Sequence, residues 1–263
     1  MNIYKISVLF ICVNGFDLNS NWDKFLSTGE TNIKKEIFKL SVLEGERINK
    51  DIDYIDIEDK IMRMLISGGH ILLVNNDYSQ AYLLRQNQTK TDIFLCYLFN
   101  THAIQHHMIQ FHSSLIEHED RGLMFLGPSG IGKTTQAELW NKYRNALIIN
   151  GDIVFVQETE DGFLGWGTPW HGSSPYCENT SVPVKALVVL KQAPENSIRE
   201  LTGFEKVTAV SNSVFYPRWL ENGMELCLET LDHLLSALPV YELSCRPDEE
   251  AVQLTEEAVF GRG

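Results

Sequence analysis

Short apolar runs separated by turn residues dominate the first ninety residues. Runs of four to eight apolar or alternating residues bounded by Gly, Asn and Asp are typical of β-strands. Asn14-Gly15, Gly68-Gly69 and Asn75-Asn76-Asp77 supply the turn signals. The pattern predicts strands at Ile6–Val13, Glu36–Val42, Met62–Leu65, Ile71–Val74 and Ala81–Leu84, with a looser alternation over Asp51–Ile57. Residues 1–90 are therefore expected to form a β-rich N-terminal module that packs on, or dimerises with, another surface; its role stays open.

From residue 91 onward, helical periodicity alternates with strand patterns. Thr91-Asp92 is a helix-capping pair, which predicts a helix over Ile93–Ile109. Strands are expected at 110–117, 123–126, 146–149, 184–190 and 240–244, with a hairpin of 154–156 and 163–166. Further helices are expected after residue 132 and over 204–210, 223–238 and 248–259. This alternation predicts an α/β domain over residues 91–263.

The strongest chemical signal lies where the apolar run 123–126 gives way to a glycine-rich turn. The sequence Gly127-Pro128-Ser129-Gly130-Ile131-Gly132-Lys133-Thr134-Thr135 has the spacing G-x-x-x-x-G-K-[ST] of a phosphate-binding loop (P-loop). Its glycines allow successive backbone N–H groups to converge, and the following helix points its positive end at the same place. Lys133 is placed to reach the β- and γ-phosphates of a bound nucleotide, and the Thr134 hydroxyl to bind Mg²⁺. The predicted nucleotide-binding residues are Gly127, Ser129, Gly130, Ile131, Gly132, Lys133, Thr134 and Thr135.

An acidic residue follows the next apolar strand. Asp152 comes directly after Asn150-Gly151, one helix beyond the P-loop. Ligands of open α/β sheets bind at the carboxyl ends of the strands, so Asp152 is expected at the same edge as the loop. There it would hold Mg²⁺, accept a proton from an attacking hydroxyl, or do both.

Histidines provide further candidates. His112 lies on the strand that should pair with the P-loop strand, and a hairpin would bring it near the phosphates. His171 lies in the segment 167–174, whose Gly and Pro content predicts a loop that either shapes an acceptor site or only buries Trp170. His102 and His106 share a helical face, but without a third ligand they are better explained as structural or surface residues.

The net charge and the cysteine content indicate which binding partners and which cellular compartment to expect. A net charge of −13 disfavours non-specific binding to nucleic acid or to an anionic membrane. The five cysteines are scattered and never form C-x-x-C, which is typical of thiols in a reducing cytoplasm. Ile6–Val13 is too short to span a bilayer and lacks the flanks of a signal peptide. We therefore expect a cytoplasmic protein.

Together, these segments resemble the HPr serine kinase family in its short form, including relatives associated with the modification of ribosomally made peptides. The resemblance covers about residues 90–260 and rests on Phe111–Ser114, Gly127–Thr135, Asn150–Asp152, and Gly167–Gly172 followed by Val184–Gln192. It implies a fold built around a P-loop and shared with ATP-dependent phosphoenolpyruvate carboxykinases. It also implies ATP, Mg²⁺ and transfer to a serine hydroxyl of a peptide or protein.

By position, the resemblance assigns Gly127–Thr134 to the triphosphate, with Thr134 near Mg²⁺. It places His112 beside the phosphates and makes Asp152 the catalytic or metal carboxylate. From the residues themselves, we expect Lys133 and His171 to join Asp152 and His112 at the transfer centre. The family pattern has two adjacent acids where this chain has Gly151-Asp152. Either Asp152 alone both binds the metal and accepts the proton, or His112 or His171 performs one of these two tasks. The glutamate-and-arginine loop of HPr kinase/phosphorylases is not visible after Gly172. A catalytically silent nucleotide-binding regulator and a small-molecule kinase are the alternatives, and homo-oligomerisation is left open.

Overall fold

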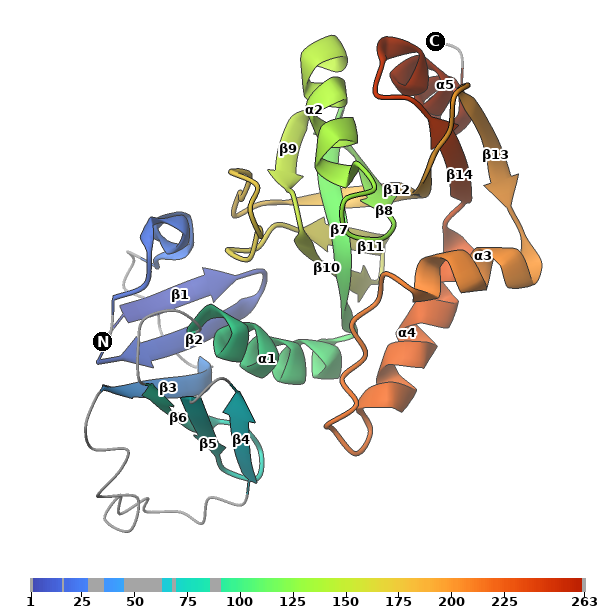
Figure 1. Cartoon of the computed structure of the whole chain (residues 1–263). Helices are drawn as coiled ribbons and strands as arrows, with labels where there is room; N and C mark the ends of the chain where they lie inside the picture. The colour runs from blue at the N-terminus through green and yellow to red at the C-terminus, as the bar shows by residue number, and fades with distance from the viewer. Residues whose placement is uncertain are drawn as a thin grey trace. The chain divides into compact units, whose positions relative to one another are not determined.

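A computed structural model describes residues 2–15, 17–27, 36–44, 63–67, 70–85 and 91–261. The chain divides into two compact units, Met1–Ala103 and Ile104–Gly263. In both units, the described residues form strands and helices (Figure 1). Helix α1 (Thr91–Ala103) groups with the N-terminal unit, whereas the sequence interpretation places residues 91–103 with the P-loop domain.

In the described part of the N-terminal unit, six strands form one mixed sheet in the order β1-β2-β3-β6-β5-β4. Its buried residues include Ile11, Leu40 and Leu83, and Trp22 and Phe25 of a short 3₁₀ helix are also buried. The strands are β1 (Asn2–Ile6), β2 (Leu9–Asn14), β3 (Glu36–Glu44), β4 (Arg63–Ser67), β5 (His70–Val74) and β6 (Gln80–Arg85).

The predicted strand at Ile6–Val13 is confirmed from Leu9 onward as β2, but its start is misplaced, because the chain reverses at Ser7. Ser7 adopts a left-handed φ of 59°, and β1 and β2 pair as an antiparallel hairpin around it. The other four predicted strands of this region correspond to β3–β6 within two residues at each end. The alternation at 51–57 and the turn at Gly68-Gly69 lie outside the described residues.

The C-terminal unit is built on a sheet of eight described strands in the order β11-β10-β7-β8-β12-β14-β13, with β9 also on β7. At its centre, β8, β12 and β14 run parallel, and their carboxyl ends meet at one edge. The strands are β7 (Met108–His118), β8 (Arg121–Leu126), β9 (Leu147–Asn150), β10 (Ile153–Thr159), β11 (Gly162–Trp166), β12 (Ser181–Gln192), β13 (Ser197–Leu201) and β14 (Val240–Cys245).

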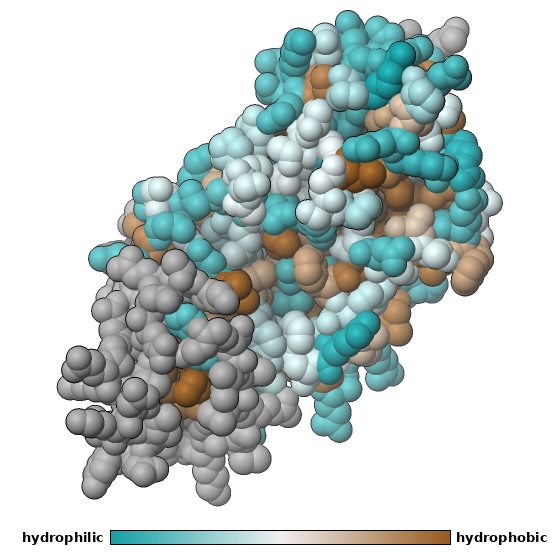
Figure 2. All heavy atoms as spheres, in the orientation of Figure 1, coloured by the Kyte–Doolittle hydropathy of each residue, from teal (hydrophilic) through white to brown (hydrophobic). Residues whose placement is uncertain are grey.

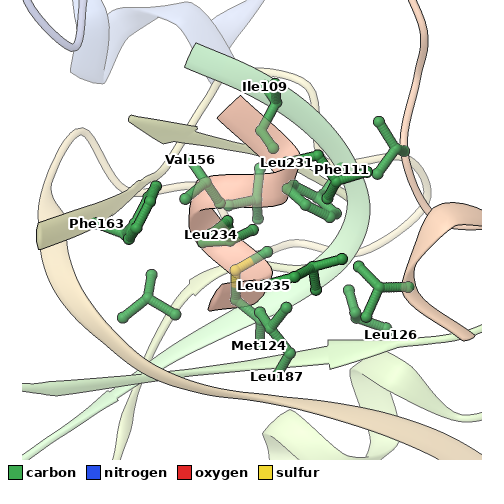
Figure 3. Close-up of a cluster of buried hydrophobic side chains, with 14 of the residues drawn as sticks. Ile109, Phe111, Met124, Leu126, Val156, Phe163, Leu187, Leu231, Leu234 and Leu235 are labelled. Atoms are coloured by element: carbon green, nitrogen blue, oxygen red, sulfur yellow. The ribbon is translucent and has the colours of Figure 1, made fainter. Parts of the chain in front are cut away.

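Strand β8, which leads into the P-loop, is buried on both faces. Met124 and Leu126 point into a core completed by α4 (Gly223–Ala237), whose Leu231, Leu234 and Leu235 appear in Figure 3. Phe125 and its neighbours on the other face pack under α2 (Lys133–Arg144) and α5 (Glu249–Phe260). The surface over α2 and α5, at the top of Figure 2, is mostly hydrophilic, as expected of helices that bury one face.

Two elements after residue 90 differ from the sequence predictions. The helix expected to reach Ile109 ends at Ala103, and a short 3₁₀ turn (Ile104–His106) leads to His107, whose left-handed φ of 53° stops helical geometry. Strand β13 was not predicted, because only Ile198 and Leu201 of its five residues are apolar, and their spacing of three gives no strand alternation. The hairpin β10–β11 and the helices α3 (Gly203–Ser211), α4 and α5 are confirmed.

The core formed with α4 gives a matched pair of leucines for a stability test. Leu234 is fully buried, whereas Leu228 on the same helix is 49% exposed. We expect Leu234→Ala to lower the free energy of unfolding by about 2–5 kcal/mol, because it leaves a cavity. Leu228→Ala should change it by less than about 0.5 kcal/mol. Urea denaturation of both variants measures this difference, and equal losses would contradict the assigned core.

Candidate functional site

The segment 127–135, predicted to bind phosphate and called the P-loop below, occupies the turn between β8 and α2. Gly130 and Gly132 adopt φ values of 77° and 115°, conformations that residues with side chains rarely take, and Gly132 is the residue before the helix. Lys133 is almost fully buried, and its Nζ donates hydrogen bonds to the carbonyl oxygens of Gly127 (3.1 Å) and Pro128 (3.2 Å). Burial lowers the pKa of Lys133, and the nearby charge of Asp152 opposes this shift.

Asp152 faces this loop across a cavity of about 450 Å³. The Thr134 hydroxyl donates to the Gly151 carbonyl at 3.2 Å, which ties the first turn of α2 to the turn that carries Asp152. Asp152 Oδ1 lies 3.0 Å from His112 Nε2, with both side chains about one-third exposed. The cavity is lined by His112, Ser129, Gly130, Gly132, Lys133, Thr134, Thr135, Gly151, Asp152, His171, Gly172, Ser173 and Ser174.

The structure therefore brings most of the predicted site residues together. All four residues expected at the transfer centre line one cavity, as do six of the eight residues expected to bind the nucleotide. Gly127 does not line this cavity, but its carbonyl accepts a hydrogen bond from Lys133, which does. Ile131 packs partly against the core under α2 and lines a different cavity.

Strand β7 positions His112 between the two turns. In the antiparallel pairings, His112 lies opposite Ile153 of β10, while the next residue, Ser113, lies opposite Leu126 of β8. The Ser113 N–H donates to the Asp152 carbonyl at 2.9 Å, and the Ser114 hydroxyl donates to the Lys133 carbonyl at 2.9 Å. Consecutive residues of β7 thus hold both the acid-bearing turn and the start of α2.

The segment 167–174 covers the other side of the cavity. His171 lines the cavity, and its Nδ1 contacts the Ser174 carbonyl, which orients the ring. Trp170 is 7% exposed and packs against Phe155, so it serves the core rather than offering a stacking face to a ligand. Gly172 lies against the acid: a Cβ placed there would come within 2.6 Å of Asp152 Oδ2.

A buried polar cluster that the sequence did not reveal supports Asp152. The Asn150 Oδ1 accepts hydrogen bonds from the N–H groups of Asp152 (2.8 Å) and Ile153 (3.1 Å). Its Nδ2 donates to the Thr168 carbonyl at 2.9 Å, and the Thr168 hydroxyl donates to the Ile153 carbonyl at 2.7 Å. Both side chains are fully buried, so the cluster fixes the Asp152 turn against the 167–174 segment.

The chemistry of the cavity suits a nucleotide-bound divalent cation. Among the described residues, no group of three or more His, Cys, Asp or Glu side chains forms a metal site. Mg²⁺, however, usually takes one or two protein oxygens and completes its shell with phosphate oxygens and water. The Thr134 hydroxyl and the Asp152 carboxylate, two hard oxygen donors in one cavity, fit that requirement.

Two histidines that do not line the cavity, His102 and His107, have local partners. The His102 ring stacks on Phe38 with centroids 5.6 Å apart, and its Nε2 lies 3.0 Å from the Tyr78 carbonyl oxygen. His107 Nδ1 lies 3.4 Å from the Thr230 hydroxyl. Within the described residues, no helix has the length and hydrophobicity needed to cross a bilayer.

Thr168 tests the buried cluster. Thr168→Val keeps the size of the side chain but removes the hydroxyl, leaving the Ile153 carbonyl and the Trp170 N–H without this partner. We expect a loss of about 1–3 kcal/mol in the free energy of unfolding. Thr168→Ser keeps the hydroxyl and should retain most of the stability in urea denaturation. If the Ser variant were the less stable of the two, methyl packing rather than the hydroxyl would hold the turn.

Comparison with known proteins gives little beyond this geometry. No family model matches the chain, and no curated protein matches it. Among solved structures, one match is the HPr(Ser) kinase/phosphatase from Coxiella burnetii, with 11% sequence identity. The matched region covers 57% of this chain and 87% of the kinase/phosphatase chain, with a TM-score of 0.33. A likeness this weak carries no argument about function, which must come from the site itself.

Proposed function

We propose that this protein is an ATP-dependent kinase that transfers the γ-phosphoryl group to a serine hydroxyl of a peptide or protein. The carrying observation is the His112–Asp152 pair, 3.0 Å apart, in the same cavity as Lys133 and Thr134. A P-loop alone binds phosphate. A carboxylate facing that loop adds a group that can orient or deprotonate an acceptor, which is the main further requirement of phosphoryl transfer.

In the proposed reaction, the serine oxygen forms a bond to the γ-phosphorus while the bond from that phosphorus to the β–γ bridging oxygen breaks. The hydroxyl proton passes to Asp152, and ADP is the leaving group. Lys133 and the P-loop amides neutralise the phosphate charge, and Thr134 and Asp152 would hold Mg²⁺, which screens the same charge. His112 orients the Asp152 carboxylate, since it engages Oδ1.

The acceptor enters, on this proposal, beside the 167–174 segment. His171, Gly172 and Ser173 form the wall of the cavity on that side, and Gly172 allows close backbone approach to Asp152. The resemblance to peptide-modifying HPr kinase relatives makes a ribosomally made peptide a reasonable acceptor to try first.

Asp152→Asn tests the assignment. The amide has the same shape but cannot accept the serine proton, so transfer should fall by about 10²-fold or more. ATP binding should remain measurable, because the P-loop is untouched. Transfer of label from γ-labelled ATP to peptides encoded beside this chain measures the first quantity, and calorimetry measures the second.

Asp161→Asn is the matched control, since Asp161 is an exposed acid in the β10–β11 turn and does not line the cavity. It should retain normal transfer. Normal transfer by Asp152→Asn would defeat the catalytic assignment. ATP binding by the wild type without transfer to any peptide, protein or small hydroxyl compound would favour a regulatory nucleotide-binding protein.

A further inference from the structure

A second cavity, of about 370 Å³, lies on the opposite flank of the P-loop. Gly130, Gly132 and Thr135 line both cavities, so the loop itself is the wall between them. The second cavity is at the carboxyl edge of the parallel strands, beside Gln192 of β12 and Cys245 of β14, which are paired in register. This is the edge at which open α/β sheets bind ligands.

The residues around the P-loop determine which way a bound triphosphate would lie along the loop. Lys133, Thr134 and Asp152, the groups expected at the γ-phosphate and its metal, all line the first cavity. The backbone of the loop cradles the α- and β-phosphates. The chain of phosphates must therefore leave the loop at the side away from Asp152, where the second cavity begins.

A buried polar atom in this second cavity lacks a partner. Gln136 is 3% exposed, and its Oε1 has no hydrogen-bond partner among the described residues. Its Nε2 donates only to the weak acceptor Cys245 Sγ, at 3.3 Å. A buried unsatisfied carbonyl oxygen is costly, and a ligand hydroxyl or amino group would satisfy it.

The walls of the second cavity combine apolar surface with a few fixed polar groups. Leu190, Ala193 and Pro247 supply the apolar part. Arg246 also lines it, with its guanidinium held by Asp248 (3.0 Å) and Glu250 (3.3 Å). A planar guanidinium whose charge is already neutralised suits a flat heteroaromatic ring better than another phosphate.

We propose that this second cavity, on the Gln136 side of the P-loop, binds the base and ribose of the nucleotide, with a ribose hydroxyl or base amino group donating to Gln136 Oε1. The inference rests on the proposed function, because it needs the triphosphate in the P-loop. Beyond the proposed function, the inference names the residues that would let the protein distinguish a nucleotide from an inorganic polyphosphate.

Tripolyphosphate separates the two halves of the site, because it carries the phosphates without the nucleoside. In Ala193→Phe, the added ring fills the second cavity. The dissociation constant for Mg·ATP should rise about tenfold or more, while that for Mg·tripolyphosphate stays within about twofold. Gln192→Trp, at an exposed wall position, is a second variant with the same expected outcome.

Glu195→Phe places the same ring on an exposed residue outside the cavity and should leave both constants unchanged. Gln136→Met removes the unpartnered acceptor and should weaken only ATP, by about fivefold. Calorimetry measures every constant, and circular dichroism checks the fold of each variant.

Failure of this inference can be told apart from failure of the kinase proposal. A wild type that binds tripolyphosphate as tightly as ATP, or folded cavity variants that bind ATP normally, would overturn the nucleoside cavity alone. Equal weakening of both ligands in folded variants would overturn it as well. A wild type that binds neither ligand would remove the proposed function and this inference together.

Discussion

The register of strand β7 is the constraint on which the candidate site depends. His112 pairs opposite Ile153 and Ser113 opposite Leu126, so two consecutive residues place the Asp152 turn and the P-loop on either side of one strand. A slip of one residue would exchange the faces of the whole strand, moving His112 away from Asp152 and Phe111 out of the core. The buried core under α4 fixes that register, because Leu115 and, as Figure 3 shows, Ile109 and Phe111 all contribute to it.

The parts of this arrangement that are local in sequence were predictable. The P-loop needs only glycine spacing between a strand and a helix, and Asp152 needs only its place after an apolar strand. The antiparallel pairing of β7 with β10 could not be predicted from the sequence. It joins segments more than forty residues apart, and the alternating pattern of each strand would allow pairing with several other strands. The Asn150–Thr168 cluster was not predicted for a related reason. Asn and Thr in loops ordinarily indicate turns, and only the tertiary contact between the two segments buries them.

The errors in the elements have equally specific causes. Ser7 and His107 both take left-handed φ values without being glycine, so the breaks they produce left no signal in the sequence. Strand β13 lies at the sheet edge, paired only with β14 among the described strands, and four of its five residues are not buried. Edge strands need less apolar surface than central ones, so a pattern based on burial does not detect them.

The packing around Gly151 leaves room for one acid, Asp152, in this turn. A Cβ at position 151 would lie 2.0 Å from Ser174 Oγ, so no side chain fits there while the 167–174 segment keeps its place. The segment in turn is held by the hydrogen bonds between Asn150 and Thr168, and it presents His171 to the cavity. A carboxylate at position 151 is therefore incompatible with the covering segment in this position. One acid, Asp152, then faces the P-loop with His112 as its neighbour, which is a simpler charge arrangement than a pair of adjacent carboxylates, whose mutual repulsion would favour protonation of one.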